Sequence, residues 1–169
     1  TDAELDAFIN RVGDMIATRV RALEMVASVT LDDTVRTGNV YALPADYAER
    51  IAIYGTLNGV RRFALRLCSV GELRAIPTTA LPMRGAIYGG SLEISGAPAT
   101  GAEWELIHFA RPTLAAGDSA TNALLTAQPN LYIHGGLFWA YMDEESLQIA
   151  TAHKDAFENE ARLINTAAA

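Results

Sequence analysis

The sequence has one cysteine, one lysine and no long uninterrupted apolar run. Because Cys68 is alone, an internal disulfide is excluded, and the chain suits a reducing cytoplasm. The longest near-continuous apolar stretch, residues 131–142, is far shorter than the about 20 residues of a membrane span, so we expect a buried helix there. No basic region followed by an apolar block occurs near residue 1, and we expect no secretion signal. The composition therefore indicates a single globular domain with its own core.

Patterns for catalysis and for metal or cofactor binding are also missing. The three histidines, His108, His134 and His153, lack metal-ligand spacing and accompany no cysteine pair. No GxSxG motif and no GxxxxGK[ST] phosphate loop occurs. The acidic run Asp143-Glu144-Glu145 is interpreted as stabilising a helix N-terminus. We interpret His134 as a core histidine and Cys68 as an inert side chain, and we expect His108 to face solvent or a neighbour. The sequence predicts a protein that is not an enzyme, with no cofactor and no metal.

The formal charge of −7 over 169 residues is unevenly distributed. Residues 1–34 carry net −4, residues 35–112 carry net +2 and residues 113–169 carry net −5. The basic residues of the middle segment include Arg61, Arg62, Arg66, Arg74 and Arg84. An excess of two positive charges is too small for a specific nucleic-acid binder. These arginines are therefore expected on strands that face solvent or a protein interface.

Helical periodicity marks both ends of the chain. Thr1-Asp2-Ala3-Glu4 has the form of a capping box, and apolar residues recur at helical spacing up to Leu23, so a helix is expected to end between Met25 and Ser28. Near the other end we expect a short helix from Thr121 to Ala127, a second from Asn130 to Met142 and a third reaching about Asn165. The helix-weakening pair Gly135-Gly136 is expected where the backbone of the first or last helix comes close.

Between Val29 and Pro112 the apolar period changes to two, which predicts strands. Asn58-Gly59 and Gly89-Gly90 are typical of two-residue hairpin turns. We expect the first turn to join strands over residues 50–57 and 60–68, with Phe63, Leu65 and Leu67 on one face of the second strand. Further predictions are a turn over Pro44 to Tyr47, a helical turn over Val70 to Ile76 and a strand over Glu103 to Ala110.

The predicted fold class is α+β. The N- and C-terminal segments form a helical bundle, and a small antiparallel β-sandwich or barrel is inserted between them. In this single domain, residues 1–28 form the N-terminal helix, residues 29–112 the β module, and residues 113–169 the C-terminal helices and a tail.

A resemblance to a known family rests on residues 121–137. The stretch TNALLTAQPNLYIHGGL resembles the TNxLLxxxPxLYLYGAL signature of head-to-tail adaptor (connector) proteins of tailed bacteriophages. Residues 19–31 are similar to that family's helix-to-strand junction, and Tyr41 to Tyr47 to its LPxDF/Y turn. The chain departs from the signature at Ala123, where an aromatic residue is common, and at residues 134–136, where His-Gly-Gly replaces Tyr-Gly-Ala. Both departures affect packing more than role.

The resemblance implies a structural virion protein at the head–tail junction, made in the bacterial cytoplasm. Such subunits form a ring, commonly of twelve copies, that docks on the portal protein, extends the DNA channel and provides the attachment site for a tail or stopper protein. It implies that DNA passes without sequence-specific binding, and that no membrane is involved. Arg162, Leu163, Ile164 and Asn165 are the expected portal-docking residues, in a tail that becomes ordered only on docking. Arg61, Arg62 and Arg66 are expected at the interface between subunits.

Three alternatives remain open from the sequence. A carbohydrate-binding β-sandwich would present exposed aromatic residues, for which Tyr54, Tyr88 and Trp104 are the candidates. A small hydrolase of unfamiliar type would need a nucleophile–base pair that the sequence does not indicate. Another ring of the virion neck, such as a stopper or tail-completion protein, would differ from an adaptor in its neighbours and not in its chemistry.

Overall fold

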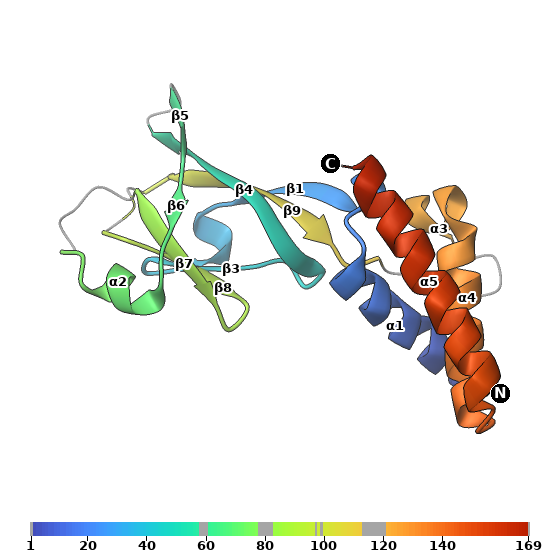
Figure 1. Ribbon diagram of the computed structural model, residues 1–169. Coiled ribbons are helices and arrows are strands. Elements are labelled where there is room, and N and C mark those ends of the chain that lie inside the picture. The colour runs from blue at the N-terminus through green and yellow to red at the C-terminus, as the bar shows by residue number, and fades with distance from the viewer. Residues whose placement is uncertain are drawn as a thin grey trace. The chain divides into compact units, whose positions relative to one another are not determined.

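The structure, a computed structural model, describes residues 2–57, 61–77, 83–96, 98, 100–112 and 121–168. The chain divides into two compact units (Figure 1). The helical unit comprises Thr1–Val26 and Phe109–Ala169, and the β unit comprises Ala27–His108. The fold is therefore of the mixed α+β class, with the first and last segments of the chain packed together and two β-sheets in the sequence between them. This confirms the predicted fold class.

The helical unit contains α1 (Asp2–Arg19), a 3-10 turn (Leu23–Met25), α3 (Ala123–Ala127), α4 (Pro129–Asp143) and α5 (Leu147–Ala167). Apolar residues from all of these elements share one core: Val12, Ile16, Val20, Ala22, Met25, Leu124, Leu131, Phe157 and Ala161. Burial of such side chains contributes about 25 cal/mol per Å² of apolar surface. The two ends of the chain thus depend on each other for their stability.

Helix α1 ends at Arg19, earlier than predicted, because the next backbone groups bond elsewhere. The Arg21 N–H donates to Oδ1 of Asn165 at 2.7 Å and does not continue the helix. The Arg21 guanidinium donates to the carbonyls of Ala17 and Val20, two of the helix-end acceptors that lack intrahelical donors. A polar side chain from α5 therefore fixes where α1 stops.

Two predicted helix starts in the C-terminal segment need correction. Asn122, and not Thr121, caps α3, with Oδ1 accepting from the Leu125 N–H at 2.7 Å. Helix α4 begins at Pro129 with Gln128 before it, so Asn130 lies inside the first turn. Proline suits this first position because its missing N–H would have no helical partner there.

The acidic run is also placed differently from the prediction. Asp143 is the last residue of α4, and Glu145 follows with φ 58°, a left-handed conformation that ends the helix. Helix α5 then starts at Leu147, with no side-chain cap from Ser146 and no acidic residue in its first turn. The interpretation of the run as a helix N-terminus is therefore wrong. Oδ1 of Asp143 instead lies 3.7 Å from Nη1 of Arg11, with which it forms an exposed ion pair.

The β unit consists of two sheets with a common core, so it is a sandwich. One sheet has the order β1-β9-β4-β5: β1 (Val26–Leu31), β9 (Glu103–Ala110), β4 (Tyr47–Leu57) and β5 (Arg61–Ala64). The other has the order β2-β3-β8-β7-β6: β2 (Arg36–Thr37), β3 (Val40–Ala42), β8 (Ser91–Ile94), β7 (Arg84–Tyr88) and β6 (Arg66–Leu67). A 3-10 turn (Asp33–Val35) and α2 (Val70–Arg74) complete the unit.

The predicted strand over residues 60–68 is in fact two strands in different sheets. β5 pairs antiparallel with β4, whereas β6 pairs with β7 in parallel, an exception to the antiparallel pairing of β2 with β3, β3 with β8 and β7 with β8. Buried Leu65 lies at the crossing, and its N–H donates to the Ile53 carbonyl of the first sheet. Phe63 and Leu67 pack against the same core, as the alternation predicted.

The other local predictions in the β unit are largely confirmed. The hairpin of β7 and β8 turns at Gly89 and Gly90, both with positive φ, and β9 has the predicted bounds. The turn before β4 and the helical turn α2 are also present, the latter with a capping box between Ser69 and Glu72. The predicted Asn58-Gly59 turn and the cap at Thr1 lie outside the described residues.

The two adjacent glycines of α4 provide a test of the packing. A Cβ built on Gly135 would approach Cγ1 of Val12 to 2.9 Å, whereas one on Gly136 meets nothing within 4 Å. Helix α1 therefore comes close to Gly135 as predicted, but through the Val12 side chain and not through its backbone. Gly135→Ala should lower the free energy of unfolding by about 1–2 kcal/mol, because overpacking exceeds the gain in helix propensity. Gly136→Ala, the matched control, should raise it by up to about 1 kcal/mol.

Urea titrations followed by circular dichroism at 222 nm measure both effects. If the two variants shift the unfolding midpoint equally and in the same direction, α1 and α4 do not pack as closely as described.

Candidate functional site

Asn165, near the end of α5, joins that helix to the end of α1. Its Oδ1 accepts from the Arg21 N–H at 2.7 Å, and its Nδ2 donates to the Arg19 carbonyl at 2.8 Å. Next to it, Ile164 packs against the helical core, and the Arg21 guanidinium lies 5.4 Å from the centre of the Phe109 ring. Two of the four predicted docking residues, Ile164 and Asn165, therefore stabilise the helical unit itself.

The other two predicted docking residues face outward from the same helix. Leu163 is 51% exposed, and Arg162 is exposed with its guanidinium donating to Oδ1 of Asn159 at 2.8 Å. Helix α5 continues to Ala167, so the expectation of a tail ordered only on docking is wrong for this segment. The end of α5 is a structured surface that presents one large apolar side chain and one cation.

The residues of the 121–137 signature hold α3 against α4. Asn122 caps α3 and also donates from Nδ2 to the Tyr132 hydroxyl at 3.0 Å. Burial raises the pKa of Tyr132, and this hydrogen bond opposes part of that rise. Leu124 and Leu131 belong to the core. The motif thus has a structural explanation: an asparagine and a tyrosine ten residues apart fix the angle between two short helical segments.

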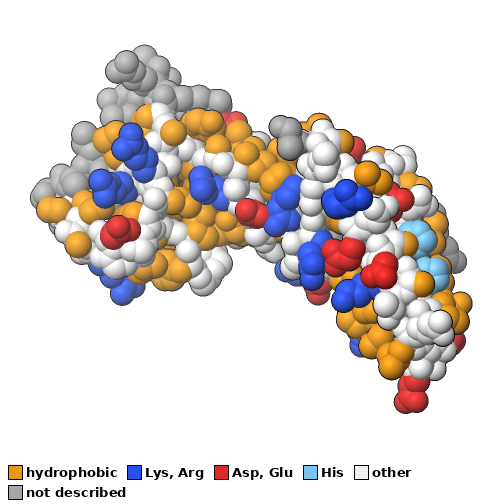
Figure 2. All heavy atoms as spheres, viewed as in Figure 1, with side chains coloured by type: hydrophobic (Ala, Val, Ile, Leu, Met, Phe, Trp, Pro, Cys, Tyr) orange, Lys and Arg blue, Asp and Glu red, His pale blue; other side chains and the backbone are white. Residues whose placement is uncertain are grey.

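The predicted interface arginines lie on β5 and β6. The structure does not describe the side chains of Arg61 and Arg62, although their backbone pairs with β4. Arg66 is exposed and lies directly beside exposed Arg84 of β7 in the parallel register. Like charges on neighbouring strands repel each other, so this pair favours an anionic partner. Figure 2 shows several arginine side chains on the visible face of the β unit.

The aromatic residues proposed for carbohydrate binding do not form a platform. Trp104 is 1% exposed and packs edge-on against Phe63 and Tyr41 in the sandwich core. Tyr88 donates to a carboxylate oxygen of Glu93 on the neighbouring strand. Because Trp104 is buried, it cannot contact a sugar, and the carbohydrate-binding alternative loses one of its three candidate residues.

Two histidines are placed differently from expectation. His108 is 2% exposed, stacked on Tyr47, with Nε2 3.8 Å from a carboxylate oxygen of Asp46, so the expectation that it faces outward is wrong. His134 is half-buried and not in the core, and its Nδ1 lies 3.2 Å from Nδ1 of His153. No spacing pattern could predict this contact, because the two residues are on different helices. Within the described ranges, no group of three or more His, Cys, Asp or Glu side chains is arranged to hold a metal ion.

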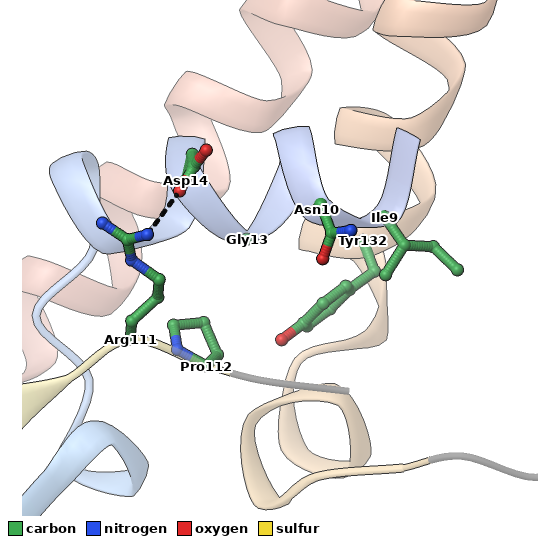
Figure 3. Close-up of a pocket in the computed structure, with 7 residues that line it drawn as sticks. All are labelled: Ile9, Asn10, Gly13, Asp14, Arg111, Pro112 and Tyr132. Atoms are coloured by element: carbon green, nitrogen blue, oxygen red, sulfur yellow. Dashed lines mark ion pairs between the residues drawn. The ribbon is translucent and has the colours of Figure 1, made fainter. Parts of the chain in front are cut away.

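A cavity of about 250 Å³ lies on the helical unit between α1 and the start of α4 (Figure 3). Its polar groups include an ion pair at 3.1 Å between Arg111 and Asp14. The other lining residues are Ile9, Asn10, Gly13, Pro112 and Tyr132. None of the seven is a serine, cysteine or histidine, so the lining offers no usual pairing of a nucleophile with a histidine base. The cavity does not suggest an active site.

The described residues thus form an α+β protein with a helical unit and a β unit, each with its own core. Over residues 1–169 the sequence matches the model of the SU10 adaptor protein family. The chain therefore belongs to the SU10 adaptor protein family, a family of phage head–tail adaptors in which no catalytic role is indicated. A search of curated proteins finds no match. Among the described residues, no helix is long and apolar enough to cross a membrane.

Replacing Asn165 tests the connection between α1 and α5. Asn165→Ala should lower the free energy of unfolding by about 1–2 kcal/mol, because it leaves a backbone donor and a backbone acceptor without partners. Asn159→Ala, which removes only an exposed hydrogen bond of the same helix, should change it by less than about 0.5 kcal/mol. Urea unfolding measures both variants. Equal effects would mean that Asn165 does not anchor α5 to α1.

Proposed function

We propose that this chain is the subunit of a ring at the junction of head and tail in the virion, which docks on the portal protein. In this role twelve copies extend the DNA channel and provide the attachment site for the tail or a stopper protein. The observation that carries the proposal is the match of the whole chain to the adaptor family. The separation into a helical unit and a β unit supports it, since a ring subunit must contact several neighbours through different surfaces.

The portal-docking surface in this proposal is the end of α5. Exposed Leu163 and Arg162 supply the apolar and cationic contacts, while Ile164 and Asn165 hold the helix end in place against α1. Because α5 is already helical to Ala167, docking costs less conformational entropy than ordering a free tail. The surface is therefore preorganised for its partner.

We infer the contact between neighbouring subunits from the different net charges of the two units. The helical unit carries twelve acidic and six basic residues, net −6, whereas the β unit carries eight and seven, net −1. In a ring each subunit meets its neighbours through two different surfaces. We assign Arg61, Arg62 and Arg66 of one subunit to a contact with the acidic helical unit of the next. In this proposal the wall of the DNA channel is acidic and repels the phosphate backbone, so DNA passes through the ring without sequence-specific binding.

Mass photometry of the protein mixed with the portal of its own phage tests the proposed function. The portal peak should gain about twelve copies of the 18.1 kDa chain and then saturate. A portal peak that keeps its mass at saturating protein would contradict the adaptor role. A stopper would bind to the portal complex only after another ring protein has been added, and this result distinguishes a stopper from an adaptor.

Leu163→Asp tests the docking surface. It should weaken portal binding at least about tenfold, because it places a carboxylate in an apolar contact. Leu147→Asp is the matched control: it is also an exposed leucine of α5, 62% exposed, about 24 Å along the helix from Leu163. It should leave portal affinity unchanged. Equal loss in the two variants, or no loss in either, would place the docking surface elsewhere.

Arg66→Glu tests the contact between subunits. It should reduce the number of copies bound per portal and make that number more sensitive to salt, since exposed charge pairs are screened. Arg66→Lys keeps the charge and should assemble like the unchanged protein. If Arg66→Glu still gives complete rings, this arginine is not at the interface.

A further inference from the structure

The contact between His134 and His153 has the geometry of a metal-ligand pair. The two residues belong to α4 and α5, and their Nδ1 atoms are 3.2 Å apart. Two nitrogens at about 2.05 Å from a tetrahedral zinc ion are about 3.3 Å apart. The distance therefore suits two ligands of one ion as well as it suits a hydrogen bond.

The surroundings support one of the two rings and leave both residues partly exposed. Tyr141 of α4 stacks on the His153 ring in parallel, with ring centres 5.6 Å apart. Both histidines are half-buried, and Figure 2 shows histidine side chains at the surface of the helical unit. An ion can therefore reach the pair from solvent, and water can complete its coordination.

The electrostatic setting favours a cation. The residues three and four positions from each histidine are all uncharged: Asn130, Leu131, Leu137, Phe138, Ile149, Ala150, Ala156 and Phe157. No fixed positive charge thus shares a helix face with either ring at the spacing where side chains meet. The helical unit as a whole carries net −6.

We propose that His134 and His153 form a two-histidine site for a transition-metal ion of the zinc type, which links α4 to α5. The ion lies to one side of the line between the two Nδ1 atoms. Each ring turns slightly about χ2, a torsion with broad preferences in histidine, to direct a lone pair at it. When the ion binds, the ring that donates the Nδ1–H changes tautomer and carries its proton on its own Nε2. Both Nδ1 atoms then have a free lone pair with which to coordinate the ion. With two protein ligands, affinity is moderate, and the ion stiffens the helical unit without any role in catalysis.

Histidine-selective ¹H–¹⁵N spectra of the full chain, with and without zinc chloride in about tenfold excess, test this site. The Nδ1 signals of two histidines should shift, while those of buried His108 stay in place as an internal control. Magnesium should shift none, because it prefers oxygen ligands. Shifts in no histidine, or equally in all three, would contradict the proposal.

Equilibrium dialysis provides a second and independent measurement. The unchanged chain should retain about one zinc ion per molecule, and His134→Gln and His153→Gln should each retain less than about a tenth of that amount. Lys154→Gln removes the positive charge next to His153 but leaves both histidines in place, so this variant should retain at least as much zinc as the unchanged chain. Unaltered circular dichroism shows that each variant folds. A variant that carries both His134→Gln and His153→Gln should bind no zinc at this site. If this variant folds and still retains zinc, the ion binds elsewhere and the assignment is overturned.

Discussion

The helical unit depends on one constraint, the return of the chain to its first helix. Ile16 of α1 and Val20, which directly follows this helix, lie in one core with Phe157 of α5, although more than a hundred residues separate them from it in sequence. Neither end can bury its apolar face alone, so most of the stability of α1 comes from packing and not from its own helix propensity. Gly135 permits the close contact of α4 with Val12, and Asn165 fixes the point where α1 ends.

This closure also explains how a sandwich can occupy the middle of the chain. The β unit begins with β1 and ends with β9, and these two strands are neighbours in one sheet. Entry and exit of the inserted segment are therefore held together within the β unit itself, and each unit has its own core. Each unit can thus carry its own contacts: an apolar and cationic helix end on one, and paired arginines on the other.

The sequence was sufficient for features that depend on local periodicity and turn chemistry. The bounds of β9, the Gly89-Gly90 hairpin and the helical turn α2 were all predicted from short-range patterns. Features set by distant partners were missed. The end of α1 depends on Asn165, the split of the 60–68 strand depends on which sheet each half joins, and the histidine pair depends on the packing of α4 on α5. His108 was predicted to face outward, although the alternation along β9 places it on the same face as buried Trp104 and Leu106.

We propose that this chain forms a ring docked on the portal, with the end of α5 at the portal. Electron cryomicroscopy of the chain bound to its portal tests this most directly. We expect a ring in which Leu163 of every subunit lies against portal density and Arg66 lies beside the helical unit of the next subunit. A ring in which α5 ends in solvent and β6 faces the portal would show that the docking surface is assigned wrongly, even if the number of copies is twelve.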